Sequence, residues 1–195
     1  NLGLHELMEG NPCDCHKTDY GKTVKSFFDN AKKIFFMSEK QMSINVDRLG
    51  LDAQKCSVLS SVFTNDVLDF MKELRSKTSA KKDVWAISAS PNWVKGAKEA
   101  KQWCTENNVE SVELNNMPYK QVLETLASSK GLCSLPPGAD TCPRLVIEAK
   151  LLGCELECNE NVQHLNEKWF DTDDVESIDK YLRSYPDRFW GVLSA

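Results

Sequence analysis

Residues 131–158 read GLCSLPPGADTCPRLVIEAKLLGCELEC, and this stretch predicts a strand, a tight loop, a helix and a second strand. The first strand is the short apolar run 131–135, which ends at two prolines and a glycine. The helix is predicted over 143–152, where apolar residues recur at helical spacing, and Gly153 follows in the position of a terminating glycine. Residues 154–158 then return as the second strand.

The loop before this helix has the features of an anion-binding site. A helix that starts at the carboxyl end of a strand presents free N–H groups and the positive end of its dipole, which both favour phosphate or carboxylate. We expect Asp140 and Thr141 to cap the helix and Pro143 to occupy its first turn. Glu148 lies about one and a half turns inside the helix, and helical side chains lean back toward the N-terminus. Glu148 can therefore reach a ligand at that end; the alternative is a capped helix with one glutamate at its solvent-exposed edge.

Strands and helices alternate along the rest of the chain. Strands are predicted at 34–37, 84–87 and 109–114, and residues 55–63 are predicted as a strand that runs into a loop. Helices are predicted at 4–8, 20–33, 39–49, 66–76, 95–106, 118–128 and 175–183, with Pro186 ending the last one. This alternation predicts an α/β fold with a parallel sheet and helices on both faces. Ligands bind to such sheets outside the carboxyl ends of the strands.

The composition is that of an ordinary globular chain. Its 195 residues suffice for one domain, or for one domain and part of another. A formal net charge of −5 argues against a nucleic-acid-binding surface, and no apolar run is long enough to predict a transmembrane segment. The first residues lack the pattern of a signal peptide, so we expect a cytoplasmic protein. Because the first residue is Asn and not Met, we expect a fragment or a processed form.

The eight cysteines are typical of reduced thiols inside an intracellular protein, since several of them lie in predicted strands or helices. Cys13, Cys15 and His16 form a C-x-C-H run, which can begin a zinc site. A second pair of ligands at close spacing is missing, and Cys154 and Cys158 make only a loose pair. We therefore favour an ordinary loop or local redox chemistry for the C-x-C-H run and expect no bound metal.

The spacing from Asp140 to Glu148 resembles the E-x7-E motif of retaining GT-B glycosyltransferases of the glycogen synthase and sucrose synthase type. In that family the segment reads roughly P-S-x-x-E-x-x-x-x-x-x-x-E-A-x-x-x-G. Pro136-Pro137, Asp140, Glu148-Ala149 and Gly153 fall in register with it, and Asp140 replaces the first glutamate. The resemblance implies the carboxyl-terminal, donor-binding half of such an enzyme.

The order of the predicted elements extends this resemblance over most of the chain. Residues 1–76 resemble the end of an amino-terminal Rossmann-like domain and the crossover that leaves it. Residues 77–170 resemble the Rossmann-like domain that holds the nucleotide sugar. Residues 171–195 resemble the helix that crosses back to the first domain. A missing amino-terminal domain is one of the partners that the resemblance implies.

The resemblance also assigns roles to residues around the loop. Lys95-Gly96 fits the end of the family's R-x-x-x-x-K-G segment, whose basic pair contacts the donor diphosphate, but the arginine position falls on Ser90. Arg144, in the first turn of the predicted helix, is our hypothesis for the replacement guanidinium. Thr141, Cys142 and Arg144 belong to the implied donor-binding loop, in which backbone N–H groups near Cys142 and Arg144 would hold phosphate.

Asp140 and Lys95 are the candidate catalytic residues, because by the same resemblance Asp140 would face the transferred sugar and Lys95 the diphosphate. Glu148 would bind the ribose diol. The segment NNMPY, which ends at Tyr119, resembles the loop that holds the nucleotide base, so Met117 and Tyr119 are donor-binding candidates and Tyr119 can stack on the base. Without the resemblance, Lys95 would be a surface lysine and Tyr119 a packed aromatic, each at the start of a helix.

The resemblance therefore implies the donor-binding part of a retaining glycosyltransferase, which moves a sugar from a nucleoside diphosphate sugar to an unknown glycan, lipid or protein acceptor. Cations on the leaving diphosphate meet the chemical need, so no metal is expected; the D-x-D string at 171–173 lies in the acidic tail. The alternative is a non-catalytic nucleotide-binding or interaction module, since this length does not hold two full domains. We expect the chain alone to bind nucleotide weakly and to transfer sugar poorly or not at all. A glycosidase built on Asp140 and Glu148 is disfavoured by the adjacent phosphate site.

Overall fold

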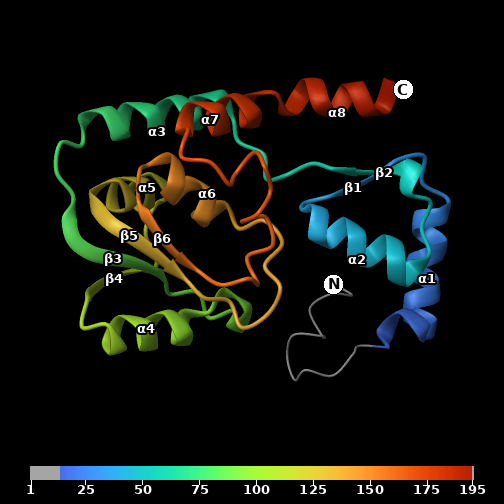
Figure 1. Ribbon diagram of the computed structural model, residues 1–195, viewed down its shortest axis with the longest axis horizontal. Helices are drawn as coiled ribbons and strands as arrows, with labels where there is room; N and C mark the ends of the chain where they lie inside the picture. The colour runs from blue at the N-terminus through green and yellow to red at the C-terminus, as the bar shows by residue number, and fades with distance from the viewer. Residues whose placement is uncertain (1–13, 195) are drawn as a thin grey trace.

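The computed structural model describes residues 14–194, which form a larger and a smaller β-sheet (Figure 1). The larger sheet has four strands in the order β4-β3-β5-β6, and the smaller sheet pairs β1 with β2. Each of these strand pairings is parallel. The strands are β1 (Ile34–Phe36), β2 (Cys56–Val58), β3 (Lys82–Ser88), β4 (Glu110–Leu114), β5 (Ser129–Ser134) and β6 (Glu155–Cys158).

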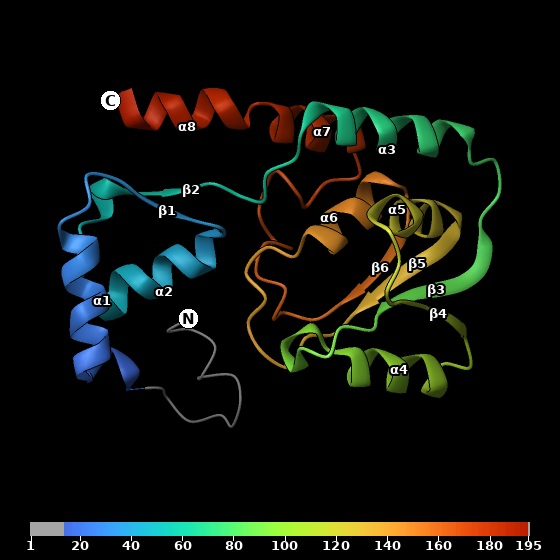
Figure 2. The same ribbon diagram turned by 180° about the vertical axis from the view of Figure 1, so that it is seen from behind.

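Helices cover both faces of the larger sheet. Helix α4 lies on one face, α5 and α6 lie on the other, and α3 with α7 forms a further layer over α5 and α6 (Figures 1 and 2). The helices are α1 (Asp19–Asp29), α2 (Glu39–Leu49), α3 (Asn65–Lys77), α4 (Ala97–Glu106), α5 (Tyr119–Ser128), α6 (Arg144–Leu151), α7 (Val175–Arg183) and α8 (Tyr185–Ser194). The predicted α/β class, with a parallel sheet flanked by helices, is confirmed and is compatible with a Rossmann-like fold.

The strand order creates a switch point between β3 and β5. From β3 the chain passes through α4 on one face to reach β4, and it then returns through α5 on the opposite face to β5 beside β3. The chain leaves β5 through α6, on the same face as α5. The loops that follow β3 and β5 therefore diverge to opposite faces of the sheet. Ligands of open α/β sheets bind outside the carboxyl ends of the strands at such a point.

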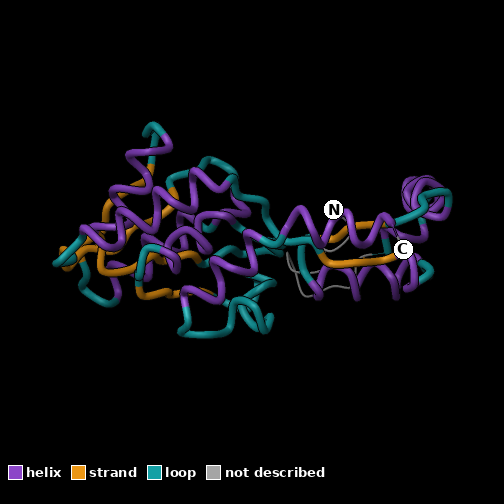
Figure 3. The backbone as a smooth tube through the Cα atoms, turned by 90° about the horizontal axis from the view of Figure 1, so that it is seen from above, coloured by secondary structure: helices purple, strands orange, loops and turns teal. Residues whose placement is uncertain are grey.

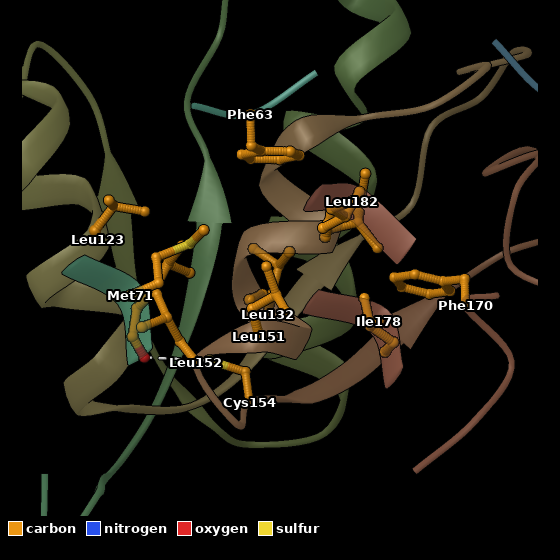
Figure 4. Packing of buried hydrophobic residues seen from close by; sticks show 14 of the residues in the cluster. Phe63, Met71, Leu123, Leu132, Leu151, Leu152, Cys154, Phe170, Ile178 and Leu182 are labelled. Atoms are coloured by element: carbon orange, nitrogen blue, oxygen red, sulfur yellow. Dashed lines mark hydrogen bonds between the residues drawn. The ribbon is translucent and has the colours of Figure 1, made fainter. Parts of the chain in front are cut away.

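The main hydrophobic cluster lies between the sheet and the helices on the α5 and α6 side. Figure 4 shows side chains from several elements meeting there, among them Met71 of α3, Leu123 of α5, Leu132 of β5 and Leu182 of α7. All four side chains are at most 1% exposed. Helix α3 precedes the boundary that we placed at residue 77, yet it buries its apolar stripe in the cluster of the larger sheet.

A second cluster fills the α4 side of the same sheet. It joins Trp85 and Ile87 of β3 and Cys133 of β5 to Ala100 and Cys104 of α4. The Trp85 ring lies across β5 at Gly131, where a Cβ atom would stand only 2.6 Å from the indole. The sheet is thus apolar on both faces, which leaves its edge at the carboxyl ends of the strands for polar residues.

The smaller sheet packs with α1 and α2 around a separate cluster that contains Ile34, Phe36, Leu49 and Leu51. Helix α8 extends from the larger part over this unit (Figure 3). The rings of Phe189 and Phe35 lie 5.3 Å apart. The N-terminus of α2 contacts the loop that follows β6: the N–H of Glu39 donates to Glu167 Oε1 at 2.7 Å. The side chains of Ser38 and Gln163 form a further hydrogen bond of 3.0 Å. These two hydrogen bonds join the smaller sheet and its helices to the larger part of the protein, beside the carboxyl edge of the larger sheet.

Several predicted boundaries are wrong for identifiable reasons. In the segment 55–63, predicted as a strand that runs into a loop, the strand covers three residues, Cys56–Val58, because its partner β1 is equally short and the chain then turns toward α3. The helix predicted at 20–33 ends at Asp29. The helix predicted from residue 95 begins at Ala97, after a separate 3-10 turn.

Pro186 does not end the helical structure of the carboxyl-terminal segment. Helix α7 ends at Arg183, and Pro186 lies in the first turn of α8, where its missing N–H would have no intrahelical partner. The helix predicted at 4–8 lies outside the described residues.

Candidate functional site

A cavity of about 490 Å³ lies at the switch point between β3 and β5. It is lined by Met37, Ser61, Ser88, Ser90, Lys95, Ser134 and residues 140–145. Six of the nine residues predicted for the site, Ser90, Lys95, Asp140, Thr141, Cys142 and Arg144, are in this lining. Met117, Tyr119 and Glu148 are not in it. The fold therefore brings the loops after β3 and β5 together around one cavity, as expected for an α/β sheet.

Lys95 and Asp140 form an ion pair in this cavity. Lys95 Nζ lies 2.8 Å from Asp140 Oδ2, and the two side chains are 37% and 12% exposed. The pair joins the loop after β3 to the loop after β5, across 45 positions of sequence. An ammonium and a carboxylate thus lie side by side in the cavity at the carboxyl ends of β3 and β5.

Gly96 fixes the position of Lys95. The 3-10 turn Trp93–Lys95 ends at Gly96, which has a φ of 65° in the left-handed region. A Cβ atom at this position would lie 2.2 Å from the carbonyl oxygen of Leu135, at the end of the neighbouring β5 segment. Only glycine permits both the backbone conformation and the close approach. Steric constraints therefore explain why a glycine follows Lys95 in this fold.

Asp140 and Thr141 do not cap α6, and the prediction that they do is wrong. Helix α6 begins at Arg144 with Pro143 in the N-cap position, and no side chain accepts a hydrogen bond there. Asp140 is held instead by its ion pair with Lys95 and by a parallel bridge to Val162. A contact from a distant part of the chain has replaced the local cap.

The loop that follows β6 supports the loop that carries Asp140. The N–H of Asp140 donates to the carbonyl oxygen of Asn161 at 2.8 Å, and the N–H of Gln163 donates to the carbonyl oxygen of Asp140 at 3.0 Å. The side-chain amides of Asn159 and Asn161 both donate to the carbonyl oxygen of Pro136, at 2.9 and 2.8 Å. These hydrogen bonds position the Asp140 carboxylate before any ligand is bound.

The start of α6 meets the cavity with uncapped N–H groups. The first N–H groups of a helix have no intrahelical partner, and no side chain caps this helix. The segment before it is fixed by Ser61, whose hydroxyl donates to the carbonyl oxygen of Cys142 at 2.8 Å. Cys142 is buried, and burial raises the pKa of its thiol to about 11, so it remains protonated near neutral pH. The backbone N–H groups at Arg144 and the residue after it are therefore free of a side-chain cap, and the prediction of an anion site at this loop rests on them.

Glu148 lies below the cavity in a cluster with Tyr119 and Arg144. The Tyr119 hydroxyl donates to Glu148 Oε1 at 2.7 Å, and Arg144 Nε lies 3.5 Å from the same oxygen. Arg144 also donates from Nη2 to the Tyr119 oxygen at 3.2 Å, and its guanidinium lies 4.4 Å from the centre of the Phe63 ring. Arg144 belongs both to this cluster and to the cavity lining, so the cluster borders the cavity that contains the Lys95 and Asp140 pair.

Burial dominates the electrostatics of this cluster. Glu148 is only 3% exposed, and its pKa is raised by burial, against the lowering effect of Tyr119 and Arg144. Burial and the neighbouring carboxylate raise the pKa of Tyr119 to about 12, so its hydroxyl stays protonated and can donate. A buried carboxylate with few partners gains from further hydrogen-bond donors, such as the hydroxyl groups of a ligand.

The remaining predicted residues lie at the margins. Tyr119 is at the first position of α5 and 43% exposed, so its ring presents a surface to solvent as well as its hydroxyl to Glu148. Met117 lies in the loop before α5, where its Sδ is 4.0 Å from the hydroxyl of Thr125. Thr141 Oγ1 lies 4.0 Å from Met37 Sδ, and Ser90 lines the cavity from the loop after β3.

The sequence interpretation missed several residues that build the cavity. Ser88 and Ser134 are the last residues of β3 and β5, Met37 follows β1 of the smaller sheet, and Ser61 lies between β2 and α3. Polar residues at the ends of predicted strands were the available signal for the two strand-end serines. The polar run 159–164, which supports the Asp140 loop, also follows a predicted strand and could have been identified in the same way.

No metal centre is apparent in the part of the chain that the structure covers. Among residues 14–194 no group of three or more His, Cys, Asp or Glu side chains is arranged to hold a metal ion. Cys13 of the C-x-C-H run lies outside these residues. Within the same range, no helix has the length and apolar character of a membrane-spanning segment. Comparisons with models of known protein families and with curated proteins found no match for this chain.

Proposed function

We propose that this chain binds a nucleoside diphosphate sugar in the cavity between β3 and β5, as the donor-binding part of a retaining glycosyltransferase. The observation that carries the proposal is the pairing of Lys95 and Asp140, 2.8 Å apart, beside the uncapped start of α6. A donor of this class combines a diphosphate, which needs positive groups, with a sugar, which needs hydrogen-bond acceptors. The site offers both kinds of group within one cavity.

The diphosphate would lie against the start of α6. Its oxygens would accept hydrogen bonds from the first N–H groups of the helix and an ion pair from the Lys95 ammonium. Arg144 lines the same cavity and supplies a second positive charge. The diphosphate would compete with Asp140 for Lys95, and the freed carboxylate would then accept hydrogen bonds from the sugar hydroxyls.

The same groups would assist sugar transfer in the whole protein. The bond from the anomeric carbon to the diphosphate oxygen breaks, the acceptor oxygen bonds to that carbon, and the acceptor proton passes to the departing phosphate. Charge develops on the leaving diphosphate and on the sugar ring, so fixed cations on one side and a carboxylate on the other stabilise the transition state. Lys95 and Asp140 take these two roles.

Glu148 and Tyr119 would hold the nucleoside end. The Glu148 carboxylate is buried beneath the helix start, and a ribose diol presents two hydroxyl donors that suit it. The exposed face of Tyr119 lies beside this carboxylate and is available for stacking on a base. The sugar would thus lie at Asp140, the diphosphate at Lys95 and the start of α6, and the nucleoside at Glu148 and Tyr119.

A nucleotide-binding module without transfer activity is the second candidate. Among the lining residues, only Met37 follows a strand of the smaller sheet, and Ser61 lies in the segment that joins β2 to α3. Within residues 14–194, few residues are therefore available to form an acceptor site opposite the larger sheet. This observation favours nucleotide binding with little or no sugar transfer by the chain alone.

Calorimetric titration with UDP, GDP and ADP tests the proposal. Wild type is compared with Glu148→Gln, which keeps the shape of the side chain, and with Glu176→Gln as the control. Glu176 is on α7, half exposed, and pairs with Lys72 and Arg75, away from the cavity. One diphosphate should bind to wild type and to Glu176→Gln.

Glu148→Gln should bind the same nucleotide more weakly by roughly 1.5–3 kcal/mol, the range for hydrogen bonds to a charged group, which is about 10- to 150-fold. Folded, equally stable Glu148→Gln protein with unchanged affinity would contradict the proposed position of the ribose. Failure of wild type to bind any of the three nucleotides would contradict the proposed function.

A further inference from the structure

A second cavity, of about 510 Å³, lies next to the candidate site, between the loop after β3, the start of α4 and Pro137. It is lined by Pro91, Asn92, Trp93, Lys98, Glu99 and Pro137, among others. Ser90 lines both this cavity and the one that contains Lys95 and Asp140. The two cavities therefore meet at one residue, and the function proposed above uses only one of them.

Trp93 gives the second cavity its character. Its side chain is 47% exposed, whereas Trp85 is buried and packs edge-on against Trp103, 4.8 Å between ring centres. Trp93 opens the 3-10 turn that ends at Lys95, and Asn92 caps this turn by accepting a hydrogen bond from the N–H of Val94 at 3.3 Å. The close approach of Gly96 to Leu135 holds the other end of the turn. An exposed indole is thus presented on a short, well-supported turn.

The rest of the lining determines which ligand fits this indole. Pro91 and Pro137 provide further apolar walls, while Asn92, Lys98 and Glu99 provide hydrogen-bond donors and acceptors. One lysine and one glutamate balance each other in charge, so the lining does not favour a phosphate or another anion. The volume falls in the range of small-ligand pockets, roughly 300–1,000 Å³.

A neutral saccharide has the matching chemistry. A pyranose ring has an apolar face of C–H groups, which packs on an aromatic plane, and an edge of hydroxyl groups, which both donate and accept hydrogen bonds. The indole of Trp93 suits the face, and the amide and charged side chains suit the edge. A free nucleotide would bring phosphates to a lining with no excess of positive charge.

We infer that the Trp93 cavity is a saccharide-binding subsite next to the donor cavity. A glycan seated on Trp93 would lie beside Ser90, which also lines the cavity that contains the Lys95 and Asp140 pair. It would serve as part of the acceptor site for the transfer reaction. This acceptor role rests on the proposed function, whereas the binding of a saccharide at Trp93 does not.

The test is saturation-transfer NMR on the whole chain with maltotriose, mannotriose and chitotriose as probes, each at millimolar concentration. Trp93→Ala is compared with wild type and with Trp190→Ala as a matched control. Trp190 is an exposed tryptophan, 63% exposed, on α8 and away from both cavities. At least one trisaccharide should bind to wild type and to Trp190→Ala, and Trp93→Ala should weaken this binding at least tenfold.

Two results would overturn the inference: no trisaccharide binds to wild type, or Trp93→Ala binds as tightly as wild type does. A saturating nucleoside diphosphate should leave saccharide binding in place, and competition between them would overturn the acceptor role. Trp93→Ala should bind UDP, GDP and ADP as wild type does. If wild type binds a trisaccharide but none of the three nucleotides, the proposed function alone is refuted. If wild type binds a nucleotide but no trisaccharide, the inference alone is refuted, so the two failures are distinguishable.

Discussion

Replacing Gly96 by alanine tests whether the Lys-Gly turn is held against the end of β5. The new Cβ would lie 2.2 Å from the Leu135 carbonyl oxygen and 2.8 Å from the Pro136 nitrogen, both of which are backbone atoms with little freedom to move. The φ of 65° adds the cost of a left-handed conformation for a residue with a side chain.

The matched control is Gly153→Ala. Gly153 follows α6 with a φ of 73°, also in the left-handed region, but its nearest neighbour would be the flexible end of Lys81, 3.9 Å away. The left-handed conformation costs roughly 1–2 kcal/mol, and overpacking costs roughly a further 1–3 kcal/mol. Gly153→Ala should therefore lose about 1–2 kcal/mol, and Gly96→Ala about 2–5 kcal/mol.

The assay is urea unfolding of the three proteins, followed by tryptophan fluorescence and circular dichroism. Both glycines belong to the larger part of the fold, so the comparison is made within one unit. Equal losses of unfolding free energy for the two variants would refute the close packing of Gly96 against β5. A loss confined to Gly153→Ala would do the same.

Three further predictions concern single side chains. Both ring nitrogens of His164 are buried without a hydrogen-bond partner among the described residues, and burial, with a smaller effect of Lys150, lowers the pKa of this histidine to about 3. The unfolded chain therefore binds the proton more tightly, so the stability that neutral His164 contributes is present above about pH 6.5 and is lost as the pH falls toward 3, by up to about 1.4 kcal/mol per pH unit. His164→Phe should flatten this pH dependence in urea titrations from pH 7 to 4, and parallel curves would contradict the assignment. Lys81 Nζ donates to the carbonyl oxygens of Ala127, Ser129 and Leu152 at 3.0–3.1 Å. Lys81→Met should therefore lower the free energy of unfolding by roughly 1.5–3 kcal/mol, while the exposed control Lys82→Met should change it little. Similar urea midpoints for the two variants would argue against these contacts. Tyr119→Phe removes the donor 2.7 Å from Glu148 and should cost roughly 1–3 kcal/mol in unfolding free energy, whereas Tyr20→Phe, at an exposed tyrosine, should be neutral.

Local signals in the sequence were enough to place most of the elements. Helix α2 is predicted at 39–49 and found at Glu39–Leu49, because Ser38 accepts a hydrogen bond from the first turn and Gly50 adopts the left-handed conformation at its end. Helix α7 is likewise found at Val175–Arg183, after a cap by Asp174. In each case the residues that set the boundary are neighbours in sequence.

Contacts between distant residues explain where the sequence interpretation was wrong. Asp140 has the chemistry of a helix cap, but the fold brings Lys95 to it and pairs its backbone with Val162. The length of β2 is set by its partner β1, which no local pattern of the 55–63 segment records. The role of the 159–164 loop depends on hydrogen bonds to Pro136 and Asp140, which become visible only when β5 and β6 lie side by side.

The sequence predicted the individual segments of the candidate site better than it predicted how those segments contact one another. The loop before α6 and the Lys-Gly turn were identified as separate features, and the structure places both at one cavity. The cluster of Tyr119, Arg144 and Glu148 was not foreseen, because Tyr119 comes from a different helix. Its three side chains were each singled out for a ligand, but their contacts with one another are a property of the fold.

Amide chemical-shift mapping with UDP, GDP and ADP tests the central claim most directly, since it locates the ligand residue by residue. If the account is correct, one of these nucleotides shifts the backbone signals of residues 95–96, 117–119 and 140–145, and leaves those of α8 unchanged. Lys95→Met should reduce the shifts at the start of α6. Shifts confined to other parts of the chain, or no shifts with any of the three nucleotides, would contradict the claim that the cavity between β3 and β5 binds a nucleoside diphosphate.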